Sequence, residues 1–251
     1  MHTTKVLTLA ITLFQSACVP LSPTQTRPVT YSYIYNVPQT GSAQRNLTIA
    51  LVRPGYADPA AIVKSGKVVQ EAGSAFTSAM RTDLEKILVA KGFKITGPFD
   101  SIDVMTFPDK KTANLTLTPM VDVRATQQVT KQTAAIGIFP GEVEGVYVVG
   151  GWISLVLLEP LTGEKIWIKK IEVNPVQEVF FWKYYATQRR NQAGQVMTET
   201  RTVEDTRGHA VAAALGKIYP EALQKAWDYL HPDEVMMVNQ HAEEARKLKR
   251  Y

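Results

Sequence analysis

Two long β-rich runs, joined by a short turn, place the strongest constraint on the fold of this chain. Residues 144–158 (EGVYVVGGWISLVLL) and 165–173 (KIWIKKIEV) are dense in β-branched and aromatic residues, and the turn EPLTGE separates them. This pattern predicts a β-hairpin, which becomes stable only when further strands or helices cover it. Gly150 and Gly151 interrupt the first run and predict a bulge or a close backbone approach.

Helical periodicity predicts the elements that cover this sheet. Residues 76–88 repeat apolar side chains at helical spacing before a stop at Gly92, and residues 211–227 form a second apolar stripe. A predicted strand, 47–53, precedes the first helix, and a polar helix begins near Pro232. We therefore expect an α+β fold: an antiparallel-rich sheet, with helices packed on one face. The predicted core consists of Ile49, Leu51, Phe76, Met80, Leu84, Ile87, Leu115, Leu117, Ile153, Leu155, Leu157, Ile166, Ile168, Leu215, Ile218 and Leu223.

The beginning of the chain has the layout of an export signal. One cation, a nine-residue apolar run and Ser16-Ala17 precede Cys18, the single cysteine. The segment resembles a bacterial lipobox, although Gln15 stands where an aliphatic residue is usual. The resemblance implies removal of residues 1–17 and a covalent lipid on Cys18; ordinary cleavage near Ala17 is the alternative. Since Val19 is not the aspartate of an inner-membrane retention signal, we expect an outer-membrane location, facing the periplasm.

The composition after Cys18 predicts how the chain is organised. Residues 18–46 are rich in Pro, Thr, Ser and Gln, which predicts a flexible tether, although an alternating segment, 31–37 (YSYIYNV), is compatible with an edge strand. Residues 47–230 are then a single α+β domain, and residues 231–251 are a polar C-terminal helix.

Neither composition nor motifs indicate catalysis. The chain has 28 Lys and Arg residues and 23 Asp and Glu residues. This surplus of positive charge is too small and too dispersed to predict nucleic-acid binding. No histidine has a partner at metal or catalytic-triad spacing, and the glycines fit neither a phosphate loop nor a dinucleotide fingerprint. We expect a protein that is not an enzyme and that carries no metal or cofactor besides the lipid.

An aromatic and basic stretch over residues 179–190 is the most unusual segment. Its aromatics either enter the core, anchor a protein interface or touch lipid headgroups. The polar residues 191–205 that follow are expected to be a mobile arm that orders on assembly. The interface candidates are Phe180, Phe181, Trp182, Tyr184, Tyr185, Arg189 and Arg190.

Three segments resemble the neuraminyllactose-binding hemagglutinin (HpaA-type) lipoprotein family: LEKILVAKGFKI (84–95), EGVYVVGGWISLVLLEPLTGE (144–164) and AVAAALGKIYPEALQKAWDYL (210–230). The resemblance implies a lipid-anchored α+β domain. In that family, glycan binding was attributed to a basic stretch before the hairpin. The matching region here lacks the Lys-Arg pair, which leaves Arg124 and Lys131 as weak glycan candidates.

These features lead to two functional expectations. The first is a structural subunit of a multi-protein envelope assembly, because the chain is similar in size and layout to accessory outer-membrane lipoproteins of the Dot/Icm type IVB secretion system. The alternative is a surface adhesin that binds sialylated glycans.

Overall fold

The computed structural model describes residues 28–39, 43–136, 139–190 and 193–249. Cys18 and the predicted signal segment lie outside these ranges. The helices are α1 (Pro59–Lys64), α2 (Lys67–Ala90), α3 (Phe107–Thr112), α4 (Arg207–Tyr229) and α5 (Pro232–Leu248), with a 3-10 turn at Ile102–Val104. The strands are β1 (Thr48–Val52), β2 (Gly55–Tyr56), β3 (Lys94–Phe99), β4 (Leu115–Thr133), β5 (Gly141–Leu158), β6 (Lys165–Arg190) and β7 (Val196–Asp205).

One sheet contains all seven strands, in the order β3-β1-β4-β5-β6-β7, with β2 beside β4. The predicted hairpin is confirmed as β5 and β6, which pair antiparallel. The bulge is confirmed too: the register of β5 and β6 shifts between Val149 and Gly151, and Gly151 has a φ of 142°. A β-carbon at Gly151 would lie 2.0 Å from the carbonyl oxygen of Asp122, so only glycine fits there.

The sheet is mixed, which corrects the expectation of an antiparallel-rich sheet. β1 pairs parallel with both β3 and β4, and β2 pairs parallel with β4. The physical reason is the long connection through α2, since a strand–helix–strand unit returns the chain to run parallel to its first strand.

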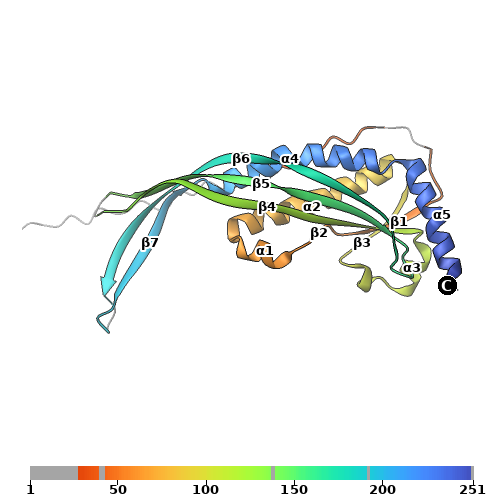
Figure 1. Cartoon of the computed structure of the whole chain (residues 1–251), viewed down its shortest axis with the longest axis horizontal. Coiled ribbons are helices and arrows are strands. Elements are labelled where there is room, and N and C mark those ends of the chain that lie inside the picture. The colour runs from red at the N-terminus through yellow and green to blue at the C-terminus, as the bar shows by residue number, and fades with distance from the viewer. Residues whose placement is uncertain (1–27, 40–42, 137–138, 191–192, 250–251) are drawn as a thin grey trace, which may run out of the picture.

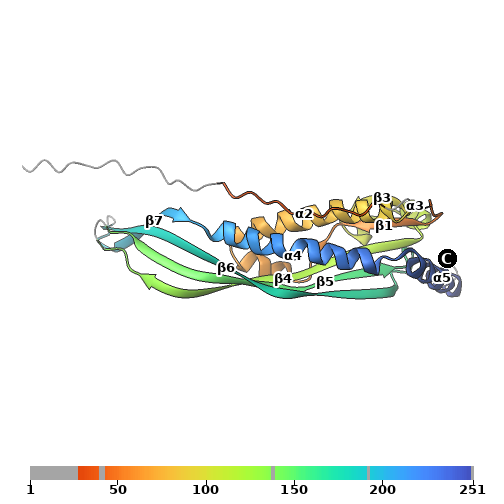
Figure 2. The ribbon, with the colours of Figure 1, turned by 90° about the horizontal axis from the view of Figure 1, so that it is seen from above.

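Helices α2 and α4 lie side by side on one face of the sheet (Figure 2). Their apolar stripes face the sheet and form the main core with the inward-facing residues of β1, β4, β5 and β6. The predicted core is confirmed, with Ile166 only partly buried, except at Ile168, which is 56% exposed. Ile168 lies on β6. The small apolar cluster that contains Ala50 is on β1, three strands away in the sheet order, so it does not cover Ile168.

Helix α5 closes the end of the sheet away from its long strand extensions (Figure 1). Val235, Val238 and Ala242 are buried in the main core. Arg246 donates to the fully buried carboxylate of Glu159 at 2.8 Å, next to the β5–β6 turn. The predicted polar C-terminal helix is therefore part of the folded body.

The alternating segment at residues 31–37 is not a free tether. It forms neither a strand nor a loose linker, but runs extended over α2 and α4 on the side opposite the sheet (Figure 2). Tyr33 is buried, and its ring lies 5.5 Å from that of Phe76 and 5.6 Å from that of Tyr219. The period-two alternation arises because alternate side chains of an extended chain point into the groove between the helices.

The packing of this segment predicts unequal effects at neighbouring positions. Tyr33→Ala removes a buried ring and its hydrogen bond to the carbonyl of Ala72, and is expected to cost about 3 to 5 kcal/mol of unfolding free energy. Ile34 is 66% exposed, so Ile34→Ala is the matched control and is expected to stay within about 0.5 kcal/mol of the parent. Urea denaturation measures both; equal, small effects would mean that the segment does not pack on the helices.

Candidate functional site

The long strands continue past the helices as a projecting β arm (Figure 1). We define the β arm as residues 126–133 of β4, 141–148 of β5, 179–190 of β6 and all of β7. Strand β7 pairs antiparallel with β6 from Trp182↔Asp205 to Arg190↔Val196. The expectation that residues 191–205 are a mobile segment is therefore wrong for Val196–Asp205, because backbone pairing with β6 orders this strand.

Strand geometry separates the aromatic stretch into two faces. The register pairs Phe180 with Gly145, Trp182 with Val143 and Tyr184 with Gly141. These three aromatics share the face that continues the core. Phe181, Lys183 and Tyr185 point to the opposite face, because side chains alternate along a strand.

Phe180 belongs to the core and does not form an exposed anchor. It is 1% exposed, and its ring lies 5.0 Å from that of Tyr147. A β-carbon at Gly145 on the neighbouring strand would lie 2.7 Å from the Phe180 ring, so the glycine makes room for the aromatic side chain. The interface hypothesis is therefore wrong for Phe180, and the alternative of core packing is confirmed.

Trp182 supports the base of the β arm. The guanidinium carbon of Arg207, at the start of α4, lies 3.7 Å from the centroid of the Trp182 ring. Arg207 also donates to both carboxylate oxygens of Asp205, at 2.9 and 2.6 Å. Burial raises the pKa of Asp205, but the hydrogen bonds and charge of Arg207 outweigh it, and the net pKa is lowered. This stack fixes the arm to α4.

The remaining interface candidates lie further along the arm. The hydroxyl of Tyr184 reaches across Gly141 to the carbonyl of Thr133, at 3.5 Å. Tyr185, on the other face, pairs in register with Arg201. Arg190 is exposed at the end of β6. The backbone of Arg189 pairs in register with that of Met197 on β7.

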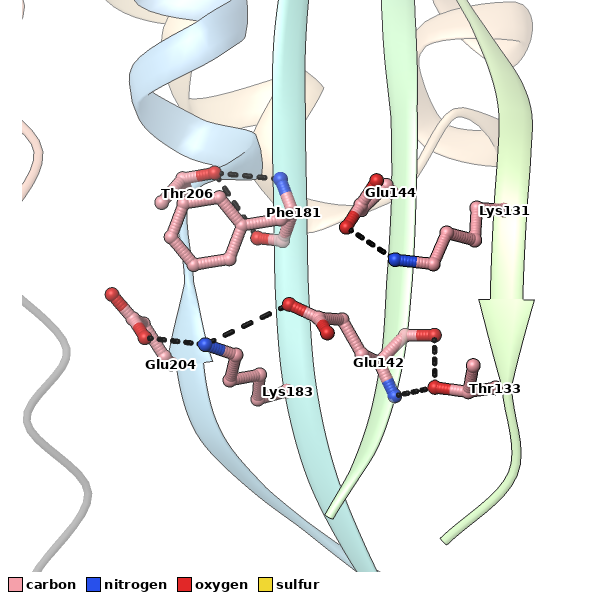
Figure 3. A network of polar contacts seen from close by, with 8 residues as sticks. All are labelled: Lys131, Thr133, Glu142, Glu144, Phe181, Lys183, Glu204 and Thr206. Carbon is pink, nitrogen blue, oxygen red and sulfur yellow. Dashed lines mark hydrogen bonds and ion pairs between the residues drawn. The ribbon is translucent and has the colours of Figure 1, made fainter.

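A shallow hollow of about 510 Å³ occupies the face of the arm that carries Phe181. Figure 3 shows the polar network around it. The ammonium of Lys131 lies 3.0 Å from Glu144, and that of Lys183 lies 3.6 Å from Glu142 and 3.9 Å from Glu204. The other residues that line the hollow are Thr130, Val179, Phe180, Phe181 and Thr206.

Backbone contacts tie the hollow to the start of α4. The hydroxyl of Thr206 accepts from the amide of Phe181 at 2.8 Å and lies 3.0 Å from its carbonyl oxygen (Figure 3). The side chains of Glu142, Lys183, Glu204 and Thr206 were not predicted as site residues. The alternation of Glu142 and Glu144 with small or apolar residues was the one sequence signal for this face.

The charges of this network do not form an anion site. Three carboxylates surround two ammonium groups, and each ammonium already contacts a carboxylate. Such a mixed surface over an aromatic floor is suited to the polar and charged side chains of a polypeptide.

The two glycan candidates do not converge. Arg124 makes a two-pronged contact with Asp122, at 2.7 and 3.2 Å, and Lys131 pairs with Glu144. The register places Arg124 opposite Gly150 and Lys131 opposite Glu144, six residues apart on β5. At about 3.3 Å per residue, the two side chains are separated by roughly 20 Å. One sugar carboxylate therefore cannot reach both.

Two kinds of feature are absent from the parts of the chain that the structure describes. In those parts, no three His, Cys, Asp or Glu side chains form a group that could hold a metal ion. The helices there are also too short or too polar to cross a membrane.

The Asp205–Arg207 contact predicts a pH-dependent contribution to stability. The pKa of Asp205 is lower in the folded chain, so its stabilisation is present above the unfolded value of about 3.9 and is lost as the pH falls through the folded value. Asp205→Asn is expected to lose about 1.5 to 3 kcal/mol at pH 7, with the difference from the parent shrinking below about pH 4.

Urea denaturation at several pH values measures this effect. Asp100→Asn is the control, because Asp100 pairs with Arg53 at the surface with 69% of its side chain exposed, and it is expected to change stability by less than about 1 kcal/mol. A deficit for Asp205→Asn that does not change with pH would contradict the assignment.

Comparison with known proteins identifies the family. The family model described as neuraminyllactose-binding hemagglutinin precursor matches residues 21–250. A crystal structure of a neuraminyllactose-binding hemagglutinin homologue from Helicobacter pylori is 14% identical and covers 84% of this chain and 99% of its own, with a TM-score of 0.56. This likeness shows a shared fold.

A second solved structure is a lipoprotein from Neisseria meningitidis, 12% identical over 52% of this chain and 83% of its own, with a TM-score of 0.26; this likeness is too low to carry an argument. No curated protein sequence matches the chain. The family match spans nearly the whole sequence, and the family resemblance of the three sequence segments is confirmed. This chain belongs to the neuraminyllactose-binding hemagglutinin precursor family.

Proposed function

We propose that this protein is a non-enzymatic, lipid-anchored envelope protein that binds other proteins through its β arm. The observation that carries the proposal is the exposure of the two outer strands of the arm, β4 and β7. Residues 126–133 of β4 are exposed at every position, and so are residues 196–201 of β7. Burial within the arm is confined to β5 and β6, where Val143, Tyr147 and Phe180 enter the main core. The outer strands add little to that core, which favours a role for them in contacts.

The strand edges of the arm support the same role. Within the described residues, β7 ends the sheet order, and β4 has no partner beyond Val121 on the side away from β5. Free edges offer rows of amide and carbonyl groups to an added strand. The mixed-charge hollow around Phe181 then supplies side-chain contacts beside those edges.

The proposed location is the outer membrane, with lipid on Cys18 as the anchor and the body facing the periplasm. The proposed partners are other envelope proteins in a multi-subunit complex. Neither the family match nor the solved structures support the narrower assignment to a type IVB secretion system, and the proposal does not include it.

A second candidate function is a surface adhesin for sialylated glycans, which the family description favours. Against it stand the candidate residues themselves. Arg124 and Lys131 are each engaged by a carboxylate, and a sialic-acid carboxylate would have to displace that partner. We therefore rank protein binding first.

A pair of substitutions on β6 tests the protein-binding role. Val179 lies in the hollow and is 76% exposed, whereas Ile168 lies on the same strand, outside the arm, and is 56% exposed. Val179→Lys is expected to reduce recovery of co-purifying envelope proteins at least several-fold, because a charge would then be buried at the contact. Ile168→Lys is the matched control and should leave recovery unchanged. Quantitative mass spectrometry after gentle detergent extraction measures both.

The adhesin alternative is tested by titration with sialyllactose. We expect no saturable binding by the parent, and no difference between the parent and Arg124→Ala. Saturable binding that Arg124→Ala abolishes, together with antibody access on intact cells, would reverse the ranking.

Lipidation of Cys18 is tested at the mature N-terminus. Mass spectrometry is expected to find acylated Cys18 as the first residue, with residues 1–17 absent. Because two or three acyl chains anchor a protein stably, Cys18→Ala should release it from the outer-membrane fraction. Unchanged fractionation of this variant would contradict the lipid anchor.

A further inference from the structure

The packed N-terminal segment leaves the body at the base of the β arm. Its contacts advance along α4 in step with the sequence: Val29 lies against Gly208, the ring of Tyr33 lies 5.6 Å from that of Tyr219, and the hydroxyl of Tyr35 donates to Gln224 at 3.1 Å. The segment therefore runs parallel to α4, and Pro28 is placed near the first turn of that helix. The same turn holds Arg207, which stacks on Trp182.

The length of chain before Pro28 limits how far a membrane anchor can be from this point. Nine residues lie between Cys18 and Pro28, so ten residue-to-residue steps join them. Even fully extended, such a chain spans at most about 36 Å. From Trp182 to Arg190 the arm rises about 26 Å, at about 3.3 Å per residue. If Cys18 is lipidated, which this inference takes from the proposed function, the bilayer lies within about 36 Å of the arm's base, a limit about 10 Å longer than the arm.

The two ends of the arm carry apolar side chains that the described chain leaves mostly exposed. Ile136 and Phe139, paired across the β4–β5 connection, are 72% and 69% exposed. Val196 and Met197, at the β6–β7 end, are 56% and 60% exposed. Both ends lie at the same extreme of the long axis, opposite α5 (Figures 1 and 2).

We infer that these two tips dock on the phospholipid bilayer that holds the anchored N-terminus. Isolated exposed apolar residues are ordinary on a protein surface, but here four lie at the two ends of the arm, and among the other described residues of the arm only Val129 and Val179 are large exposed apolar side chains. Arg190 is exposed and lies opposite Val196 in the register, which places a cation for lipid phosphate beside an apolar side chain.

The depth of this contact is limited by the backbone. Hairpin ends carry amide and carbonyl groups that need water or polar partners, so they enter the headgroup region and not the hydrocarbon centre. Membrane contact at the tips leaves the edges and the hollow of the arm open to proteins. The inference thus adds a second membrane contact and an orientation to the proposed function: arm toward the bilayer, α5 away from it.

Tryptophan quenching in vesicles tests this orientation. The lipidated full chain is reconstituted into phosphatidylethanolamine and phosphatidylglycerol vesicles whose acyl chains are brominated. Phe139→Trp and Met197→Trp report on the two tips. Leu248→Trp is the control, because Leu248 is 84% exposed and lies on α5 at the opposite end. Emission of the parent, which has four tryptophans, is subtracted.

We expect loss of most of the added emission, with a blue shift, for both tip variants and no loss for Leu248→Trp. If the parent floats with the vesicles but the two tip variants are not quenched, the tip contact alone is overturned. The occupant of the tips would then be a protein. Equal quenching at Leu248 would also overturn it, because the body would then lie flat. A parent that does not float would overturn the lipid anchor, and the tip contact with it.

Discussion

The packing of Tyr33 between α2 and α4 is the contact on which the arrangement of this molecule depends. Three rings, from Tyr33, Phe76 and Tyr219, meet at centroid distances of 5.4 to 5.6 Å. The hydroxyl of Tyr219 donates to the buried carboxylate of Asp83 at 2.8 Å, and Lys86 pairs with the same carboxylate at 2.7 Å. Burial, followed by this hydrogen bond, raises the pKa of Tyr219, so the hydroxyl stays protonated as a donor. The cluster joins the N-terminal segment and both helices into one layer over the sheet.

This layer divides the molecule into two parts with different physical characters. Over the body, helices on one face and the strands beneath them bury a continuous core. Past Trp182 the strands lose their cover, and the arm is held by backbone pairing, by the Arg207–Trp182 stack and by exposed ion pairs. Such pairs stabilise little on their own. A stable body that carries a thinly supported arm is a suitable design for a protein that acts through contacts.

The N-terminal segment also relates the proposed lipid anchor to the arm. An unpacked linker would let the body take any orientation relative to a membrane, whereas the packed segment fixes the exit point of the chain beside Arg207. The described N-terminal segment therefore begins in the same region from which the arm projects. The membrane contact and the protein contact that we propose use different parts of one element, its tips and its edges.

Much of the fold was predictable from the sequence, because its signals are local. The hairpin of β5 and β6, the bulge at Gly151, the C-terminal end of α2, the beginning of α5, and nearly every core position follow from periodicity, proline and glycine placement. The strand–helix–strand order around β1 also indicates its parallel pairing, although the expected sheet was antiparallel-rich. The exposed position of Ile168 was not predictable, because a local apolar pattern does not show which part of a sheet face is covered.

The candidate site depended on tertiary structure. Strand periodicity alone separates Phe180, Trp182 and Tyr184 from Phe181 and Tyr185 once the segment is known to be a strand. The register between neighbouring strands decided the rest: it brought Lys131 to Glu144, Lys183 to Glu142 and Glu204, and Arg207 onto Trp182. The sequence by itself determined which residues are apolar, where the main helices and the central hairpin lie, and the resemblance to a family. Only the tertiary structure decided that Val196–Asp205 is a strand, which charges meet and where the N-terminal segment packs, since these result from the register and packing of whole segments and not from local sequence.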